Sequence, residues 1–387
     1  MPSPSRPPDI VMSSAQRHPS HIENDHMDYQ SSESPGNPLH GCVAGGKHPH
    51  DLAVSPRLVK KRRIVVTEGR PSEFLDLTKT EGQMTSDDYR LVHKLRAALQ
   101  YKEKIVAVVG AGISVSAGVP AFSSSTGLFT DIVKQYNIRG PRTFLFDASV
   151  YNLPETTQAF HAMVKQLAET TQKANPTPFH HLLASMAGGK RLLRLYSQNI
   201  DSIDASMEPL ATQVPLSPKS PWPTTIQLHG SIGKMVCTKC KELRPLEPLV
   251  FEGAEAPLCP SCVSADHART DDGKRSHGIG RLRPRFVLYN GDNPDEEAIG
   301  KVTAADLKAR PDAVLVAGTA LKISGLRRLI KEMCKATRQR KNGLTIWINT
   351  DGAPRCAELQ DCWDIVVKAD CDKVAQIVDL PRYDAQC

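Results

Sequence analysis

Two Cys-x-x-Cys pairs constrain the fold of this chain more than any other feature of its sequence. The first pair is Cys237 and Cys240, the second is Cys259 and Cys262, and eighteen residues separate the pairs. This spacing is typical of a zinc ribbon, in which four thiolates surround one tetrahedral zinc ion. Four sulfur ligands leave no coordination position for water. We therefore expect a structural zinc ion; four unliganded thiols are the less favoured alternative.

The rest of the composition favours an intracellular, metal-binding protein. Apolar runs stay well below the roughly 18 residues that a membrane span needs, and the first residues lack the apolar centre of a secretory signal. We expect a cytosolic or nuclear address, where cysteine pairs bind metal more often than they form disulfides. The formal net charge of +7 favours anionic partners such as chromatin or nucleotides.

Apolar runs that alternate with helical stretches predict the main fold. Ile105 to Val109 is a run of branched apolar residues, typical of a buried parallel strand, and it leads directly into a glycine-rich turn. A helix with Ser86 as its N-cap is expected to precede this strand. Later apolar runs end at Ser197, Gly318 and Asn349. The alternation predicts an α/β fold with a Rossmann-type, doubly wound parallel sheet.

Composition also suggests how the chain is divided. Residues 1–80 are rich in Pro, Ser, His and charge, so we expect a disordered basic tail. Within it, Lys60 to Arg63 is typical of a nuclear import signal, with a solvated charge run as the alternative. Residues 81–387 are expected to form one folded domain. Its Rossmann parts are about 86–120, 180–230 and 285–380, interrupted by a small domain at about 121–179 and a zinc ribbon at 231–284.

Three further segments suggest a ligand site. Gly110 to Gly118 follows a strand, where small residues let the backbone approach a dinucleotide phosphate, although tight packing is an alternative. Ser197 to Asp201 follows another strand end, where open α/β sheets bind ligands. His229 precedes a glycine and could act as a general base near neutral pH, or it could be structural. The polar stretch from Ser264 to Arg283 is expected to be a mobile loop.

Together these segments resemble a known family. GAGISVSAGVP, SQNID, QLHG, the paired Cys-x-x-Cys motifs, GTALKISG and WIN occur in the order and approximate spacing of sirtuins. Sirtuins are NAD-dependent protein-lysine deacylases, and the resemblance covers about residues 86–380. The chain is most similar to the fungal nuclear branch that acts on acetylated histones. The resemblance implies NAD and zinc as cofactors, acetylated histones or other acetyl-lysine proteins as partners, association with chromatin, and a nuclear location.

The resemblance also assigns roles to residues. It implies that His229 is the catalytic base and that Asn199 and Asp201 assist it. Substrate would add a strand along Val287, Leu288 and Tyr289. The implied NAD pocket is lined by Gly110, Ala111, Gly112, Ile113, Gly118, Phe122, Gln198, Asn199, Asp201, Gly318, Thr319, Asn349, Thr350 and Cys371.

One departure from the family pattern concerns the loop that follows the glycine turn. Ala121-Phe122-Ser123 lacks the arginine that sirtuins carry at the position of Ser123. Losing a charge-assisted contact of about 1.5–3 kcal/mol would weaken NAD binding by about one to two orders of magnitude. Besides an active deacetylase, two alternatives therefore remain: a catalytically weak sirtuin-fold module that binds chromatin, and a mono-ADP-ribosyltransferase.

Overall fold

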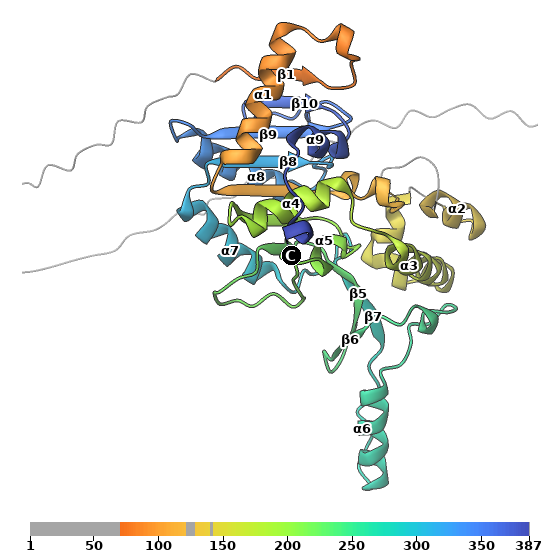
Figure 1. The fold of residues 1–387 in the computed structure, drawn as a ribbon. Helices are drawn as coiled ribbons and strands as arrows, with labels where there is room; N and C mark the ends of the chain where they lie inside the picture. The colour runs from red at the N-terminus through yellow and green to blue at the C-terminus, as the bar shows by residue number, and fades with distance from the viewer. Residues whose placement is uncertain (1–69, 121–127, 140–141, 387) are drawn as a thin grey trace, which may run out of the picture. The chain divides into compact units, whose positions relative to one another are not determined.

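The computed structural model describes residues 70–120, 128–139 and 142–386 (Figure 1). Residues 1–64 and 65–387 form separate units, and the description that follows concerns the second. The basic cluster at Lys60 to Arg63 lies outside the described residues. Among the helices of the described part, none has the length and apolar character needed to cross a bilayer.

A seven-stranded sheet forms the larger part of this unit. All its neighbouring strands pair in parallel, in the order β1-β10-β9-β8-β2-β3-β4. The strands are β1 Glu73–Asp76, β2 Ile105–Val109, β3 Leu192–Ser197, β4 Thr225–Gln227, β8 Ala313–Ala317, β9 Leu344–Asn349 and β10 Ile365–Lys368. The expected doubly wound parallel sheet is confirmed.

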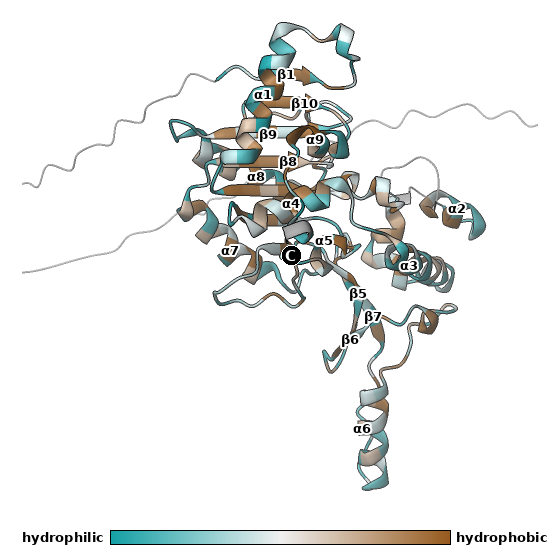
Figure 2. Cartoon of the chain, in the orientation of Figure 1, coloured by the Kyte–Doolittle hydropathy of each residue, from teal (hydrophilic) through white to brown (hydrophobic). Residues whose placement is uncertain are grey.

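Helices cover both faces of this sheet because its central strands are apolar on both faces. In β2, Ile105, Ala107 and Val109 face one hydrophobic core, whereas Val106 and Val108 face another. The first core includes α1 Ser86–Tyr101, α4 Pro178–Gly188 and α9 Cys371–Val378. The second includes α7 Glu296–Ala309 and α8 Ser324–Arg338. Figure 2 shows the strands of this sheet coloured largely as hydrophobic.

The expectation of disorder as far as residue 80 is wrong. Glu73–Asp76 forms the edge strand β1, which pairs in parallel with β10. Leu75 and Leu77 alternate onto one face and are buried in the core under α1. A four-residue strand in a polar neighbourhood gives little periodic signal, yet its burial orders the chain before Ser86.

A smaller part carries the cysteine motifs. Its three-stranded antiparallel sheet has the order β6-β5-β7, with β5 Gly230–Cys237, β6 Leu243–Pro245 and β7 Leu282–Phe286. This sheet shares a hydrophobic core with α2 Leu128–Gln135 and α3 Pro154–Lys173. The short helix α5 Ile203–Ser206 follows β3. The 3-10 helices are η1 Glu81–Gln83, η2 Ala111–Ile113, η3 Val115–Ala117, η4 Arg142–Phe146, η5 Ala148–Tyr151, η6 Pro248–Val250 and η7 Tyr383–Gln386.

One segment expected to be a loop is partly helical. Helix α6, Pro260–Asp271, extends from the three-stranded sheet (Figure 1) and includes Ser264 and the residues that follow it. Pro260 suits the first helical turn, and Cys262 is the only buried residue of this helix. A helix with so little buried surface has no apolar periodicity, so the sequence pattern could not reveal it.

Candidate active site and zinc centre

The carboxyl ends of five parallel strands bring the predicted site residues to one edge of the large sheet. Gly110 follows β2, Gln198 follows β3, His229 lies two residues beyond β4, Gly318 follows β8, and Asn349 ends β9. The chain runs outward from β2 to β3 and β4, then returns to β8 on the other side of β2. The strand order therefore reverses between β2 and β8, which is where open α/β sheets bind ligands.

Glycines let two backbones meet at this reversal. The Gly112 N–H donates to the Gly318 carbonyl at 2.8 Å. A Cβ on Gly112 would lie 2.6 Å from the Gly318 Cα, and one on Gly110 would lie 2.8 Å from the Thr319 Cβ. Larger residues would force the strands apart, so these glycines are required for the tight packing of the two turns. The turn continues into η2 and η3 instead of the longer helix expected from a Rossmann pattern.

A buried hydrogen-bonded cluster lies next to this turn. The Asn199 Nδ2 donates to the Ser114 Oγ at 3.2 Å, and the Ser114 hydroxyl donates to the Asp201 Oδ2 at 2.7 Å. The Ile203 N–H fixes the other Asp201 oxygen at 3.0 Å. Burial raises the pKa of Asp201, although these two hydrogen bonds oppose the shift. The buried Asn199 Oδ1 has no protein partner within the described residues and is available to a ligand donor.

A second network joins the ends of β3, β8 and β9. The Gln198 Nε2 donates to the Val109 carbonyl at 3.1 Å and to the Thr319 Oγ1 at 2.9 Å. The Asn349 Nδ2 donates to the Thr319 carbonyl at 2.9 Å. These amide side chains are therefore held at fixed positions along the sheet edge before any ligand binds.

The hydrogen bond of His229 defines its tautomer. Its Nδ1 lies 3.0 Å from the Gln198 carbonyl oxygen. Because a carbonyl only accepts, Nδ1 carries the proton and Nε2 keeps a lone pair. Burial lowers the pKa of His229, while the bond to Gln198 opposes that shift. The ring is thus neutral and basic at Nε2 near pH 7.

The predicted substrate segment, Val287 to Tyr289, already makes backbone hydrogen bonds within the protein along one of its two edges. The Val287 N–H donates to the His229 carbonyl at 2.8 Å. Tyr289 pairs with residues 146–148, since its N–H donates to the Phe146 carbonyl at 2.7 Å and its carbonyl accepts from Ala148 at 2.9 Å. Leu288, between them, points its backbone the other way, and its N–H has no backbone partner in the described part of the chain.

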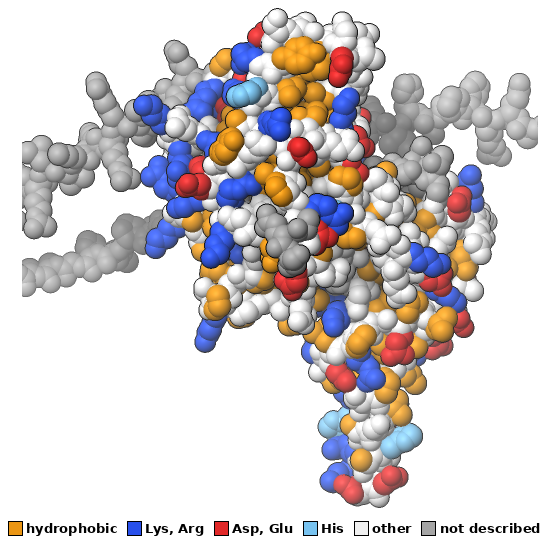
Figure 3. Space-filling model, in the orientation of Figure 1, with side chains coloured by type: hydrophobic (Ala, Val, Ile, Leu, Met, Phe, Trp, Pro, Cys, Tyr) orange, Lys and Arg blue, Asp and Glu red, His pale blue; other side chains and the backbone are white. Residues whose placement is uncertain are grey.

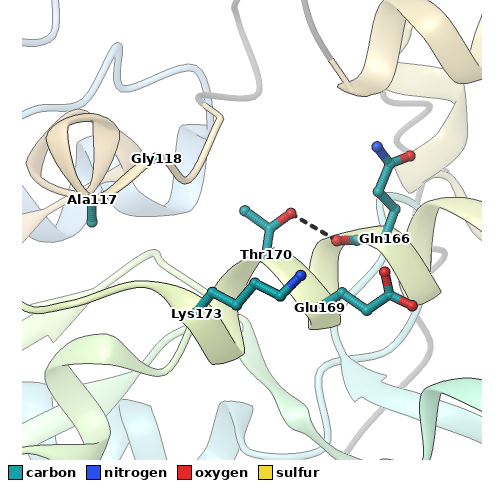
Figure 4. Close-up of a pocket in the computed structure, with 6 residues that line it drawn as sticks. All are labelled: Ala117, Gly118, Gln166, Glu169, Thr170 and Lys173. Carbon is teal, nitrogen blue, oxygen red and sulfur yellow. Dashed lines mark hydrogen bonds between the residues drawn. The ribbon is translucent and has the colours of Figure 1, made fainter.

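The remaining predicted cofactor residues are dispersed around the cluster. Ile113 is buried, and its carbonyl accepts from the Thr177 hydroxyl at 3.0 Å. Cys371 begins α9 in the core, whereas Thr350 is exposed. Gly118 lines a pocket of about 360 Å³ between η3 and α3 rather than joining the hydrogen-bonded cluster (Figure 4). Ala111 is half-buried in η2. Ala121, Phe122 and Ser123 lie outside the described residues, so their effect on NAD stays a prediction.

Sequence patterns missed several polar residues of the site. Ser114, which links Asn199 to Asp201, lies within the quoted glycine motif, but nothing local marks its hydroxyl as a bridge. Asp372, beside Cys371, accepts from the Ser116 hydroxyl and from the Phe179 N–H. Asp204 is fully buried, and the Ser197 hydroxyl and the Ala205 N–H lie near its carboxyl group and oppose a rise in its pKa. Burial and the nearby Asp201 raise the pKa of Asp204 to about 7.

The four predicted zinc ligands come together at one point. Their sulfur atoms all lie within 4.8 Å of one another. The Sγ atoms of Cys237 and Cys262 are 3.7 Å apart, as are those of Cys240 and Cys259. A tetrahedron with metal–sulfur bonds of about 2.3 Å has edges of about 3.8 Å, so the sulfurs fit zinc closely. N–H groups of Lys239 and Cys240 lie 3.4 Å from the Cys237 Sγ and would support a thiolate.

Comparisons with known proteins agree with this geometry. A family model described as the Sir2 family matches residues 110–325, more than half of the chain. The chain is 47% identical over 342 residues to the "NAD-dependent protein deacetylase hst4" of Emericella nidulans, covering 88% of this chain and 57% of that protein. It is 36% identical over 291 residues to the "NAD-dependent histone deacetylase HST4" of Saccharomyces cerevisiae, covering 73% and 76% of the two chains.

A solved structure shares the fold. The structure of a Sir2 homologue in complex with NAD matches with a TM-score of 0.53 at 21% identity, covering 74% of this chain and 92% of that one. At this identity the likeness concerns the fold alone. The fold, the family model and the relatives that cover most of this chain lead to one assignment: the chain belongs to the Sir2 family.

Proposed function

We propose that this protein removes acetyl groups from lysines of histones in an NAD-dependent reaction. The observation that supports this most directly is the neutral His229 at the ligand edge of the sheet, whose Nε2 has no hydrogen-bond partner among the described residues. The named relatives are deacetylases of this kind, and the chain spans little more than half of the Emericella protein. The products would be nicotinamide, O-acetyl-ADP-ribose and deacetylated lysine.

The described residues fit NAD. The glycine turn after β2 lies at the ligand edge of the sheet, and the Asn199 Oδ1, which has no partner among the described residues, could accept from a ribose hydroxyl or the nicotinamide amide. Gln198, Thr319 and Asn349 would line the rest of the cleft. NAD, when bound, would supply a ribose whose anomeric carbon loses nicotinamide and whose hydroxyl takes the acetyl group.

The residues of the site have different roles in the proposed reaction. His229 takes a proton at Nε2 from a ribose hydroxyl, and the Gln198 carbonyl stabilises the resulting imidazolium through Nδ1–H. Ser114 holds Asn199 and Asp201 together through its hydroxyl, so this cluster is ordered before the ligand binds. The free N–H of Leu288 would pair with the substrate backbone, so recognition of side chains should be modest.

One assay tests the proposal. Purified protein is incubated with NAD and an acetyl-lysine histone peptide while nicotinamide, O-acetyl-ADP-ribose and protein-bound ADP-ribose are followed. We expect the first two products, and we expect His229→Ala to lower kcat/KM by about 10²–10⁴-fold without loss of zinc. Absence of all three products at millimolar NAD would reject the enzyme. Protein-bound ADP-ribose alone would replace deacetylation by mono-ADP-ribosyl transfer.

The pH dependence is a second test of the base. Because burial lowers the pKa of His229, its neutral form persists below pH 6.5. We expect kcat/KM to fall on acidification only below that pH, with no such limb in the residual activity of His229→Ala. A limb at pH 7 or above that survives the substitution would show that another group is the base.

We also propose a nuclear, chromatin-associated location. Histone substrates and the basic Lys60–Arg63 cluster support it, although the cluster lies outside the described residues. Replacing these four residues by glutamine in a fluorescent fusion should shift the protein to the cytoplasm. Unchanged nuclear fluorescence would show that another segment directs import.

A further inference from the structure

The positive charge of this chain is concentrated in one segment. Residues 322–341 contain eight Lys and Arg and a single acidic residue, Glu332, for a net charge of +7. This equals the formal net charge of the whole chain, so all other residues together are neutral on the same count. The position of this segment therefore decides where a polyanion would bind. The cations are Lys322, Arg327, Arg328, Lys331, Lys335, Arg338, Arg340 and Lys341.

Helix α8 presents part of this charge on one solvent face. Leu326, Ile330 and Met333 are buried against the sheet, which fixes how the helix is oriented. Arg328, Lys331 and Lys335 are exposed, and their spacing of three and four residues places them on one face. The row spans about 10 Å along the helix axis.

Three of the eight cations have structural partners. Arg327 pairs with Glu358 at 2.6 Å, Arg338 pairs with Asp364 at 3.2 Å, and Arg340 donates to the Arg310 carbonyl at 2.7 Å. The other five are exposed and have neither an ion pair nor a side-chain hydrogen bond within the described residues. They are Lys322, Arg328, Lys331, Lys335 and Lys341. None of the five lies within ion-pair distance of an acidic group of the described part, and the exposed Glu332 on the same face leaves Arg328, Lys331 and Lys335 with a net charge of +2 (three minus one).

The patch continues onto the amino-terminal edge of the large sheet. Exposed Lys104 precedes β2, and exposed Arg310 precedes β8. Figure 3 shows Lys and Arg side chains gathered on this side of the molecule, near the end of α1. The Asp312 carboxylate at this edge already accepts the N–H groups of residues 103 and 104, at 3.1 and 2.9 Å. It is therefore engaged in the turn between α1 and β2.

We propose that the exposed face of α8, together with Lys341, Lys104 and Arg310, binds the phosphate backbone of duplex DNA. Duplex DNA carries one negative charge per about 1.7 Å, so a rigid row of cations meets several phosphates at once. Residues 322–341 contain no Phe, Tyr or Trp on which unpaired bases could stack, which favours a duplex over a single strand. Binding through phosphates alone is independent of sequence.

The location of this surface has a consequence for the reaction. It extends to the amino-terminal edge of the sheet, whereas His229 and the glycine turn lie at the carboxyl-terminal edge. DNA could therefore stay bound while an acetyl-lysine enters the site. This consequence rests on the proposed deacetylation of histones, but DNA binding itself does not.

The test compares charge-matched variants of the full chain. Binding to a fluorescein-labelled duplex of about 30 base pairs is measured between about 50 and 200 mM salt. Arg328→Gln, Lys331→Gln and Lys335→Gln, made together, should weaken binding about tenfold or more at the lowest salt and lower the salt slope by about 3. Lys134→Gln, Lys173→Gln and Lys219→Gln remove equal exposed charge elsewhere and should change affinity less than about twofold. Equal effects in the two variants, or none in the first, would overturn the proposal.

Further variants and ligands distinguish the α8 surface from the tail and DNA from acidic proteins. Replacing Lys60 to Arg63 by glutamine tests whether the tail binds DNA instead; if it abolishes binding while the α8 variant binds normally, the proposal is wrong. Polyglutamate binding that depends on α8, with unchanged DNA binding, would assign the surface to acidic proteins.

The α8 variant should melt like the wild type and deacetylate free peptide normally, but lose activity on nucleosomes. No deacetylation by either protein would reject the proposed function and leave the DNA result standing.

Discussion

The large and the small sheet of this protein are stabilised in different ways. The seven-stranded sheet has a hydrophobic core on each face, and every residue of β2 and β8 is buried. The three-stranded sheet has a three-residue strand without a buried residue, and helix α6 buries only Cys262. Besides the hydrophobic core that it shares with α2 and α3, the small region has four sulfur atoms that meet at one point. Stability in the large region is therefore distributed over two cores, whereas the end of the small region that carries the cysteines depends on a single centre.

The largest expected effect comes from breaking that centre. Structural zinc contributes about 10–16 kcal/mol in zinc-finger peptides, and removing one thiolate by Cys259→Ser should abolish tight binding. We expect the three-stranded sheet to lose its hydrogen-exchange protection while β2 and β8 keep theirs. Cys356→Ser, outside the quartet and half-buried, is the control. Zinc content equal to wild type in Cys259→Ser would contradict the ribbon.

A cavity in the core of the large sheet should lower the stability of that sheet without releasing zinc, in contrast to Cys259→Ser. Ile346 in β9 is fully buried, so Ile346→Ala should lower the free energy of unfolding by about 2–5 kcal/mol. Because the effect is spread over a large core, zinc should stay bound in the folded variant. Denaturant titration with a zinc assay on the same samples measures both. Zinc release at the native pH without denaturant would show that the two regions are one cooperative unit.

Two buried titratable groups should give the large region opposing pH dependences. His180 accepts the Thr177 N–H at 3.2 Å, and burial lowers its pKa to about 4. Below pH 6.5 the unfolded chain binds this proton first, so stability falls as pH drops toward 4. Burial raises the pKa of Asp204 to about 7, so the unfolded chain loses that proton first, and stability falls as pH rises from about 4 to 7.

Variants that remove either His180 or Asp204 test these opposing pH dependences of stability. In His180→Asn the Asp204 contribution remains, and stability should decrease from about pH 5 to pH 7. In Asp204→Asn it should increase over the same range. Each full contribution is about 3–4 kcal/mol, since one pKa unit corresponds to about 1.4 kcal/mol. Urea unfolding at several pH values measures the slopes. Equal slopes in the two variants would contradict the assignment of both groups.

The smallest expected effect concerns one helix end in the large region. Thr85 caps α1: its Oγ1 accepts from the Asp88 N–H at 3.2 Å, and Asp88 accepts from the Thr85 N–H at 2.8 Å. Thr85→Ala should cost about 1 kcal/mol of unfolding free energy, and Ser86→Ala, one residue later, clearly less. A larger cost for Ser86→Ala would restore the residue that the sequence suggested as the cap.

The sequence was most informative where chemistry or burial is strict. Strands β2 and β9 are buried on both faces, which produces continuous apolar runs that no loop would carry. The two Cys-x-x-Cys motifs correctly predicted that the four cysteine sulfur atoms lie close together. Strand β1 was missed because four residues next to a polar tail carry too little pattern, and α6 because a solvated helix has no apolar face.

For the site, motifs indicated His229, Asn199 and Asp201, but not what holds them. The Ser114 hydroxyl meets residues more than 80 positions away, and only the parallel pairing of β2 with β3 brings them together. The tautomer of His229 depends on a carbonyl that any residue could supply. The raised pKa of Asp204 is a property of its buried surroundings, which no local spacing encodes.

The pairing of Gly230 with Phe286 has a practical consequence for altering this protein. Gly230 and Phe286 are the first and last residues of the segment that carries the cysteines. Their neighbours His229 and Val287 are joined by a hydrogen bond. Since the two ends of this segment meet, lengthening the chain between them costs little extra loop-closure entropy. The exposed residues 272–278 beyond α6 are therefore a suitable place to insert a peptide tag or attach a dye while the base stays in position.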